Sequence, residues 1–251
     1  MNTILGIDVG GSGIKGTLVD IKKGRFNEER YRIETPPSAK PQQIAKIISK
    51  IAKHYDYKGP IGVGFPAVIS NGFIKTATNI DKSNIDVNAE NLFSKICKTK
   101  VYILNDADAA GIAEMRFGHG KNFKGTTLFL TIGTGIGSAL FTKQKMIPNT
   151  EFGHIIMPNG LIAEKYTSDA TRKRENLDWN KWGERFNVYL NYMNKLLNPD
   201  QIIIGGGTSK KLDKFIDKID VRKKIKPAKL LNDAGIIGAA MFALEKSKKD
   251  K

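Results

Sequence analysis

Residues 101–110 read Val-Tyr-Ile-Leu-Asn-Asp-Ala-Asp-Ala-Ala, an apolar run that leads into an amide, a carboxylate and then small residues. An apolar, β-rich run of this length predicts a buried strand, and the small residues after it predict a helix that starts close to the strand's end. In open α/β sheets, ligands bind outside the carboxyl ends of the strands. The stretch therefore predicts an α/β fold with Asp106 at the edge of a ligand site.

Asp106 has two interpretations at such a junction. Its carboxylate could act as a general base on a ligand at the strand's end. Asp is also a common N-cap residue, whose side chain accepts hydrogen bonds from free backbone N–H groups of a helix. The stretch by itself leaves both open, and motifs elsewhere in the chain are needed to choose between them.

The chain has 251 residues, of which 40% are apolar, so it can bury a sizeable core as one large domain or as two lobes. No run of about eighteen apolar residues is present. Residues 1–8 contain neither a basic leader nor a long apolar segment. We expect a cytoplasmic protein with no membrane association.

Cysteine and histidine are too sparse for a disulfide or a zinc site. Cys97 is the single cysteine, and the three histidines are scattered along the chain. The formal charge of +16 would attract polyanions such as nucleic acid, anionic membrane or polyphosphate. A solvated, lysine-rich surface, including the tail at residues 248–251, is the alternative explanation of this charge.

Three glycine-rich segments each follow an apolar run. The first, Gly10–Gly13, joins a strand expected over residues 4–9 to one expected over residues 14–20. Without side chains, the backbone N–H groups of such a turn can approach an anion. No helix follows, so the segment is neither a dinucleotide fingerprint nor a Walker loop. An ordinary hairpin turn is the alternative.

The second segment, Gly133–Gly137, repeats this pattern between residues 127–132 and 138–141. The recurrence suggests two lobes that each offer a hairpin phosphate loop to a shared cleft. The third segment, Gly205–Gly207, follows a strand expected over residues 201–204 and precedes a helical pattern. A nucleotide phosphate could therefore lie at a helix N-terminus there.

Glu151 and His154 form a Glu-x-x-His pair, which can be half of a di-metal motif on a bundle helix. Here Pro148, Gly153 and Pro158 break any long helix, and no second copy completes a metal cage. On a loop, a carboxylate and an imidazole can instead exchange hydrogen bonds with polyol hydroxyls. A surface loop without function is the alternative.

The remaining periodic segments predict the scaffold. Residues 44–51 predict an amphipathic helix, residues 61–66 a strand, Ser70–Gly72 a turn and residues 234–244 a helix of small residues suited to tight packing. A long apolar helical stripe is assigned to the core, and it consists of Trp182, Phe186, Tyr189, Leu190, Met193, Leu196 and Leu197.

These motifs resemble those of the ROK (repressor, open reading frame, kinase) family of sugar kinases, over nearly the whole chain. Asp8-x-Gly10-Gly11-Ser12 is similar to the family's first phosphate motif, and Gly133-Thr134-Gly135-x-Gly137 to its second. Gly205-Gly206-Gly207 is similar to its adenosine-side motif. Asn105-Asp106 resembles its sugar-binding and base pair, and Glu151-x-Gly153-His154 its sugar-recognition motif.

The chain lacks the cysteine-rich zinc motif that usually follows the sugar-recognition motif. This absence and the short length, together with Phe65-Pro66, residues 78–83 and residues 182–185 after Glu164, resemble the polyphosphate-dependent glucokinase branch of the family. In that branch an aromatic residue commonly follows the Asp-Lys-Ser segment, whereas this chain has Asn84. That departure leaves the donor and sugar preferences open.

The resemblance implies an α/β chain with the two-lobed actin-like ATPase (ribonuclease H-like) fold and a central cleft. A smaller lobe is expected over residues 1–105, completed by a C-terminal helix at 234–251, and a larger lobe over residues 106–233. The implied reaction transfers a phosphoryl group from inorganic polyphosphate, or ATP, to the 6-hydroxyl of glucose. A strictly ATP-dependent glucokinase and a glucomannokinase are the alternatives, and the family implies a homodimer.

The resemblance also assigns roles to residues. Asp106 is the expected general base, and Asp8 is expected to hold Mg²⁺ through water. The sugar hydroxyls are expected to bind Asn79, Asn105, Glu151, His154 and Glu164. The phosphates are expected to bind Asp8, Gly10, Gly11, Ser12, Lys15, Gly133, Thr134, Gly135, Gly205, Gly206 and Gly207. No zinc is expected, and a cationic surface suits a long polyphosphate chain.

Two other classes of protein are less well supported. Regulators of the family carry an N-terminal DNA-binding helical segment, whereas this chain begins within its first strand. A nucleic-acid-binding protein would fit the charge, but no signature of such a module is present. We therefore expect an enzyme that acts on glucose or mannose, with no nucleic-acid partner.

Overall fold

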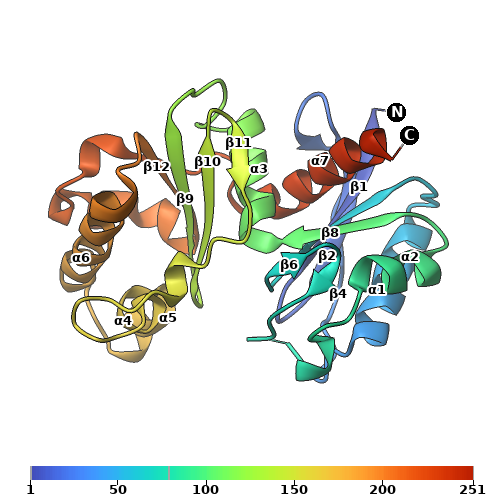
Figure 1. Ribbon diagram of the computed structural model, residues 1–251, viewed down its shortest axis with the longest axis horizontal. Coiled ribbons are helices and arrows are strands. Elements are labelled where there is room, and N and C mark those ends of the chain that lie inside the picture. The colour runs from blue at the N-terminus through green and yellow to red at the C-terminus, as the bar shows by residue number, and fades with distance from the viewer. Residues whose placement is uncertain (1, 79, 251) are drawn as a thin grey trace. The chain divides into compact units, whose positions relative to one another are not determined.

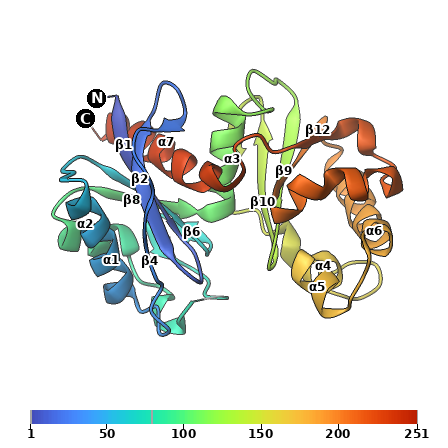
Figure 2. The same cartoon turned by 180° about the vertical axis from the view of Figure 1, so that it is seen from behind.

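The computed structural model describes residues 2–78 and 80–250, which form two compact units (Figures 1 and 2). Unit 1 is Met1–Phe117 with Asp233–Lys251, and unit 2 is Gly118–Asn232. This division differs from the expected boundary at residues 105/106 by helix α3 (Asp106–Phe117), which packs on α7 (Ala234–Lys249) in unit 1. Asn79, an expected sugar ligand, lies outside the described residues.

Unit 1 is built on a six-stranded sheet with the order β3-β2-β1-β5-β8, in which β4 also pairs with β2. Strands β1, β5 and β8 run parallel, so their carboxyl ends share one edge of the sheet. The strands are β1 (Thr3–Val9), β2 (Ile14–Asp20), β3 (Arg25–Phe26), β4 (Tyr31–Ile33), β5 (Ile61–Phe65) and β8 (Val101–Asn105). The strands expected at 4–9, 14–20, 61–66 and 101–104 are therefore confirmed.

Helices cover both faces of this sheet (Figure 1). On one face, α1 (Pro41–His54) and α2 (Ala89–Cys97) bury a core that includes Leu5, Ile7 and Val63. The helix expected over residues 44–51 is the middle of α1. The turn expected at Ser70–Gly72 is also confirmed, since it joins β6 (Ile69–Ser70) to β7 (Phe73–Ile74). A short 3-10 helix, η1 (Lys82–Asn84), precedes α2.

On the other face, α7 packs on the sheet at glycine contacts. A Cβ at Gly6 would overlap the backbone oxygen of Ile236, and one at Gly62 would overlap that of Ala239. Within α7, Gly238 meets the backbone of Ala109 in α3 in the same way. The expected tight packing of the small-residue helix is therefore confirmed.

Unit 2 is built on a five-stranded sheet with the order β11-β10-β9-β12-β13. Strands β9, β12 and β13 run parallel, and β10 pairs antiparallel with β9 to form a hairpin. The strands are β9 (Thr126–Ile132), β10 (Ile136–Thr142), β11 (Lys145–Ile147), β12 (Gln201–Gly206) and β13 (Ile225–Pro227). Both glycine hairpins anticipated from the sequence are present, one in each unit.

The main helix of unit 2 is α6 (Trp179–Leu197), preceded by the short helices α4 (Ala163–Thr167) and α5 (Asp169–Arg174). Most of the expected apolar stripe is buried, from Trp182 to Met193. Leu196 was assigned wrongly to the core, because it is 55% exposed. It lies about 100° around the helix from Leu197, which packs against the core.

Short 3-10 helices fill the connections of unit 2. They are η2 (Phe152–His154), η3 (Gly207–Lys214), η4 (Ile216–Lys218) and η5 (Arg222–Lys224), followed by η6 (Leu231–Asp233) at the junction with unit 1. The helix expected after Gly205–Gly207 is thus η3, a 3-10 segment with a kink at Lys211 rather than an α-helix. Within residues 2–78 and 80–250, every helix is too short or too polar to span a bilayer.

Candidate active site

The junction of β8 and α3 places Asp106 at the start of the helix. Asn105 acts as its cap, since its Oδ1 accepts the backbone N–H groups of Ala107 at 2.8 Å and Asp108 at 3.1 Å. Its Nδ2 donates to the carbonyl of Ala67 at 3.1 Å, and the residue is 7% exposed. Asp106 is the first helical residue and is partly exposed. Capping is therefore performed mainly by Asn105, although Asp106 Oδ1 also accepts from Ala107 N–H, at 2.7 Å.

Asp8 and Asp106 stand on the same edge of the unit 1 sheet. In the strand register, Asp8 lies opposite Gly64 of β5, and Gly64 lies opposite Leu104 of β8. Two inter-strand spacings, about 10 Å, therefore separate the strands that carry the two carboxylates. A Cβ at Gly64 would lie 3.7 Å from the Cα of Asp106, so glycine keeps the middle strand free of a side chain there.

The first glycine turn is held by a set of short hydrogen bonds. Gly10 N–H donates to the carbonyl of Gly13 at 3.1 Å. The Thr35 hydroxyl donates to Gly10 O at 2.6 Å, and Arg32 Nη2 donates to Ser12 O at 2.7 Å. These bonds fix the backbone of the turn, which is the condition for a preorganised anion site.

Two cations flank this turn. Lys15 on β2 pairs in register with Arg32 on β4, and Lys15 Nζ lies 3.2 Å from Asp8 Oδ2. Sequence reasoning identified Lys15 but missed Arg32. No local motif marks Arg32, because it lies 20 residues from Ser12 and only the pairing of β4 with β2 brings it to the turn.

The second glycine turn joins β9 to β10. Gly133 N–H donates to Gly135 O at 3.0 Å, and the backbone N–H of Ala170 donates to Gly133 O at 3.2 Å. A Cβ at Gly133 would have no heavy atom within 4 Å, as is also true at Gly11 in the first turn. Both turns thus combine a constrained backbone with an open outer side, and Thr134 is exposed beside the second.

The three expected sugar ligands of unit 2 come together. His154 Nδ1 lies 3.1 Å from Glu151 Oε2, and His154 Nε2 lies 3.8 Å from Glu164 Oε1. Glu164 Oε2 accepts the backbone N–H of Ile136 at 3.4 Å, next to the second glycine turn. An imidazole between two carboxylates, at the base of a glycine turn, can bind hydroxyl groups as donor and acceptor.

Local packing explains the Glu-x-Gly-His spacing. A Cβ at Gly153 would overlap the carbonyl oxygen of Ile136, so only glycine lets η2 lie against β10. The Ser138 hydroxyl of β10 donates to Thr150 O at 2.6 Å and accepts Phe152 N–H at 3.0 Å. Glycine and serine therefore hold the segment between Glu151 and His154 in place.

Burial raises the pKa of Glu151. Desolvation is the largest cause; His154 opposes it by lowering the pKa, and the nearby Glu164 carboxylate adds to the increase. A carboxylate whose charge is disfavoured in this way gains from a hydroxyl donor placed against it.

The third glycine segment is tightly packed. Gly206 has φ of 76°, and a Cβ there would overlap the backbone of Ile132 at the end of β9. Gly205 lies against the Phe129 ring, since a Cβ added at Gly205 would be 3.0 Å from the nearest ring carbon. Next to it, the Thr208 hydroxyl is buried and has no hydrogen-bond partner among the described residues. Thr208 is therefore a further candidate ligand-binding residue at this segment, which the sequence did not single out.

Asn84 occupies the position where the branch commonly has an aromatic residue. Its side chain is fully buried, and Nδ2 donates to Ala39 O at 3.0 Å and to Asp81 O at 2.8 Å. The substitution therefore ties η1 to the loop that precedes α1.

One carboxylate is available for a divalent metal at the first turn. Over residues 2–78 and 80–250, no group of three or more His, Cys, Asp or Glu is arranged to hold a metal ion. Mg²⁺ is commonly held by one or two carboxylates together with substrate phosphates. Asp8, beside the first glycine turn and near Gly235 at the start of α7, fits that kind of site.

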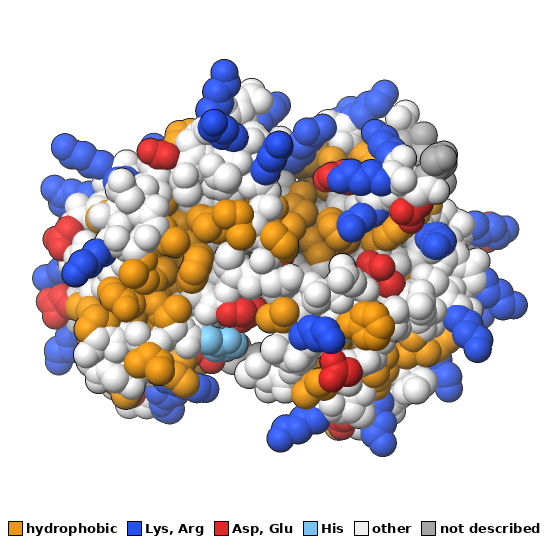
Figure 3. Space-filling model, in the orientation of Figure 1, with side chains coloured by type: hydrophobic (Ala, Val, Ile, Leu, Met, Phe, Trp, Pro, Cys, Tyr) orange, Lys and Arg blue, Asp and Glu red, His pale blue; other side chains and the backbone are white. Residues whose placement is uncertain are grey.

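Cationic side chains are spread over the visible face of the molecule rather than gathered in one stripe (Figure 3). This distribution agrees with the solvated-surface explanation of much of the +16 charge.

Residues 4–164 match the model of the ROK family. The chain is 43% identical, over 95% of its length and 90% of the relative's, to a polyphosphate glucokinase of Mycobacterium tuberculosis (strain CDC 1551 / Oshkosh). It is 38% identical to the inorganic polyphosphate/ATP-glucomannokinase of Arthrobacter sp. strain KM, whose structure matches with a TM-score of 0.92 over 98% of this chain and 100% of that enzyme's. The structure of a ROK family glucokinase from Streptomyces griseus, in complex with glucose and AMPPNP, is 22% identical and matches with a TM-score of 0.80. This match covers 97% of this chain and 99% of the Streptomyces chain.

These matches confirm the expected α/β architecture, which is the actin-like ATPase fold. They extend over both units, so the two glycine hairpins and the Glu151-His154 segment all lie in matched sequence. The chain belongs to the ROK family.

Proposed function

We propose that the protein is a glucokinase that transfers a phosphoryl group from inorganic polyphosphate to the 6-hydroxyl of glucose. The observation that carries this proposal is the 43% identity to a polyphosphate glucokinase across 95% of the chain. The arrangement of the expected site residues within each unit supports it. Phosphoryl transfer needs positioning and charge stabilisation more than covalent chemistry, and fixed glycine turns and carboxylates can supply both.

Asp106 is the proposed general base. Its carboxylate lies at the carboxyl end of β8, while Asn105 satisfies the backbone N–H groups of the first helical turn. The Asp106 carboxylate can therefore accept the proton of the attacking hydroxyl as the oxygen–phosphorus bond forms. A primary amide has two N–H groups, so Asn105 can still offer one to the sugar while the other donates to Ala67.

The other proposed sugar ligands are Glu151, His154 and Glu164, which meet beneath the second glycine turn. Carboxylates accept hydrogen bonds from sugar hydroxyls, and the imidazole can donate or accept. Asn79 is also proposed as a sugar ligand, on the family motif alone.

The proposed donor site uses the two glycine turns, with Lys15 and Arg32 beside the first. Asp8 is proposed to hold Mg²⁺ through water, where the ion would neutralise charge on the phosphoryl oxygens. Gly205–Gly207 are proposed to serve the nucleoside side of ATP when ATP is the donor. A glucomannokinase that uses both donors is the second candidate, favoured by the match to the Arthrobacter enzyme.

The test is a set of four coupled assays, with glucose or mannose as acceptor and polyphosphate or ATP as donor. Formation of glucose 6-phosphate from polyphosphate, lost in Asp106→Asn, is the expected result. Activity with ATP alone would reject the polyphosphate donor while leaving the kinase assignment intact. Equal rates with mannose would favour the glucomannokinase.

We further propose a homodimer that uses the solvent side of α6. Val188 is 46% and Leu196 55% exposed, and with the half-buried Tyr192 between them they repeat every four residues along one face. Such an exposed apolar stripe suits a self-complementary contact. Light scattering should give a dimer for the wild type and a monomer for Val188→Asp/Leu196→Asp, and a monomeric wild type would reject the proposal.

A further inference from the structure

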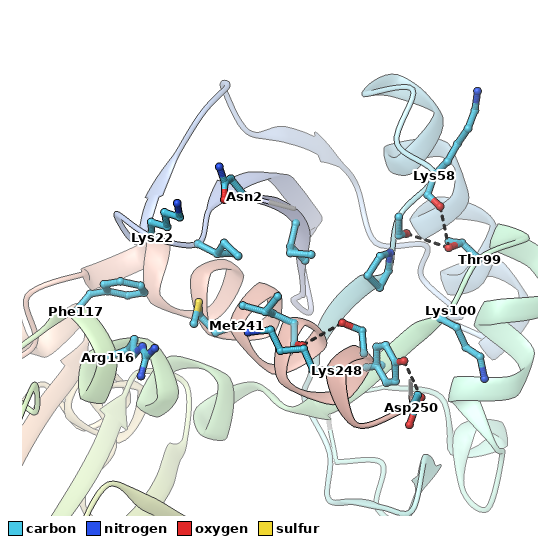
Figure 4. Close-up of a pocket in the computed structure, with 17 residues that line it drawn as sticks. Asn2, Lys22, Lys58, Thr99, Lys100, Arg116, Phe117, Met241, Lys248 and Asp250 are labelled. Atoms are coloured by element: carbon cyan, nitrogen blue, oxygen red, sulfur yellow. Dashed lines mark hydrogen bonds between the residues drawn. The ribbon is translucent and has the colours of Figure 1, made fainter.

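A cavity of about 840 Å³ opens in unit 1 and is unrelated to the phosphate turns (Figure 4). Asn2, Gly59 and Thr99, which line it, precede β1, β5 and β8. The cavity therefore lies at the amino ends of these strands, whereas Asp8 and Asp106 lie at the carboxyl ends. A seven-residue strand such as β1 spans about 20 Å, which separates the two sites.

The floor of the cavity is apolar. Ile4 and Met241 are buried beneath it, at 1% and 9% exposure, and Leu244 continues the surface along α7. Ile21 and Pro60 complete this lining from the loops on either side. Lining of this kind is typical of small-molecule sites, whose volumes run from roughly 300 to 1,000 Å³.

The rim of the cavity is cationic. The positively charged side chains among the lining residues are Lys22, Lys58, Lys100, Arg116 and Lys248. The one carboxylate among the lining residues, Asp250, accepts a hydrogen bond from the Tyr102 hydroxyl at 2.8 Å. Lys58 is paired with Asp56, whose Oδ1 lies 3.5 Å from its Nζ, which leaves four cations against Asp250. This excess favours an anionic ligand, and the apolar floor favours a ligand that is not anionic throughout.

One end of the cavity combines an aromatic ring with two cations. Phe117 and Arg116, at the end of α3, lie on the same side as Lys22 (Figure 4). Gly24 lets the Phe117 ring lie there, because a Cβ at that position would overlap the ring. A ring beside a guanidinium and an ammonium can stack on a flat heterocycle and bind its phosphate.

We propose that this pocket is a nucleotide site, separate from the phosphoryl-donor site. The base stacks at Phe117 over the apolar floor, and the phosphate pairs with Arg116 and Lys22. An inorganic phosphate chain would leave the floor uncovered, and an uncharged apolar ligand would leave the cationic rim without a partner. This inference does not depend on the kinase assignment, since all the lining residues lie outside the site described above.

The test uses AMP, which has no phosphoryl group to donate in the proposed reaction. Calorimetry on the full chain should show AMP binding, and Arg116→Glu or Lys22→Glu should weaken it by about tenfold or more, because each loses a charge-assisted hydrogen bond. Lys46→Glu is the matched control, since Lys46 is an exposed lysine of α1 on the opposite face of the same sheet. All three charge reversals are on exposed side chains, so the folded state should persist.

Two further ligands separate nucleotide binding from simple anion attraction. Adenosine, without a phosphate, and inorganic tripolyphosphate, without a base, should both compete poorly with AMP at this pocket. The proposal is overturned if AMP does not bind, if both pocket variants bind AMP as the wild type does, or if tripolyphosphate displaces AMP as well as a second nucleotide does. If AMP bound at Gly205–Gly207 instead, both pocket variants would bind AMP as the wild type does.

Discussion

Glu164 is hydrogen-bonded to the second glycine hairpin, since its Oε2 accepts the backbone N–H of Ile136 at 3.4 Å. Its other oxygen, Oε1, lies 3.8 Å from His154 Nε2. One carboxylate thus touches both the hairpin expected to bind the donor and the histidine expected to bind the sugar. A side chain in this position can transmit a change at the sugar ligands to the donor turn.

Replacing Glu164 should separate these two roles. Glu164→Gln keeps a carbonyl oxygen for Ile136 N–H but removes the charge beside His154, so the KM for glucose should rise while the KM for polyphosphate changes little. Glu164→Ala removes the acceptor as well, and the KM for polyphosphate should then rise about fivefold, the value of one ordinary hydrogen bond. Steady-state kinetics with each substrate varied in turn measures both effects.

Lys145→Ala is the control for Glu164, because Lys145 is an exposed lysine of β11 in the same unit. This variant should leave both KM values close to those of the wild type. A donor KM that rises equally in Glu164→Gln and Glu164→Ala would show that the contact with Ile136 does not support the hairpin.

Asp106→Asn should lower kcat by about 10²–10⁴-fold, the usual contribution of a general base. The amide keeps an oxygen for the Ala107 N–H, so helix α3 and its cap at Asn105 should be preserved. Calorimetry should show glucose binding close to that of the wild type. Turnover near the wild-type rate, with glucose still bound, would remove Asp106 from the mechanism.

The features that could be predicted from sequence are those specified by neighbouring residues. The hairpin at Gly10–Gly13 follows from glycines between two apolar runs, and the burial of most of the apolar stripe of α6 follows from helical periodicity. The expectation for Asp106 was local in the same sense, since the apolar run to Leu104 and the small residues after it place the carboxylate at a strand's end.

The features that could not be predicted depend on long-range pairing. Arg32 reaches Ser12 only because β4 pairs with β2, and a three-residue strand gives almost no periodic signal. The contact of Glu164 with Ile136 joins residues 28 positions apart in sequence. Leu196 was assigned to the core because periodicity does not reveal where the buried face of the last turn ends: Leu197 packs against the core, whereas Leu196 is 55% exposed.

Arg32→Ala should weaken donor binding through the first glycine turn. The variant loses the hydrogen bond from the guanidinium to Ser12 O and one of the two cations beside the turn. We expect the KM for polyphosphate to rise about tenfold, as for loss of one charged hydrogen bond, with the KM for glucose unchanged. Arg25→Ala, an exposed arginine on β3 of the same sheet, is the control and should match the wild type. An equal effect of both variants would indicate general attraction by surface charge.

Glu151 should make stability depend on pH. Burial raises its pKa in the folded protein, so between the unfolded and the folded pKa only the folded state holds the proton. The contribution of Glu151 to the free energy of unfolding is therefore fully present below the pKa that Glu151 has in the unfolded chain. It is lost as the pH rises through the pKa that Glu151 has in the folded protein. Glu151→Gln should have a higher Tm than the wild type at about pH 8 and an equal Tm near pH 3.5, since Glu titrates around 4.3 when unfolded. A Tm difference independent of pH would contradict this explanation.

Gly238→Ala should destabilise unit 1 strongly. A Cβ at this position of α7 would overlap the backbone oxygen of Ala109 in α3, and backbone cannot move aside as a flexible side chain can. Overpacking of this kind costs about 1–3 kcal/mol or more, which corresponds to a Tm lower by several degrees in a chain of this size.

Gly207→Ala is the control, because a Cβ at Gly207 meets no heavy atom within 4 Å. Thermal unfolding followed by circular dichroism should show a loss for Gly238→Ala and almost none for Gly207→Ala. Equal Tm values would mean that α7 can shift away from α3 without cost, and the glycine contacts would then not determine how closely the two helices pack.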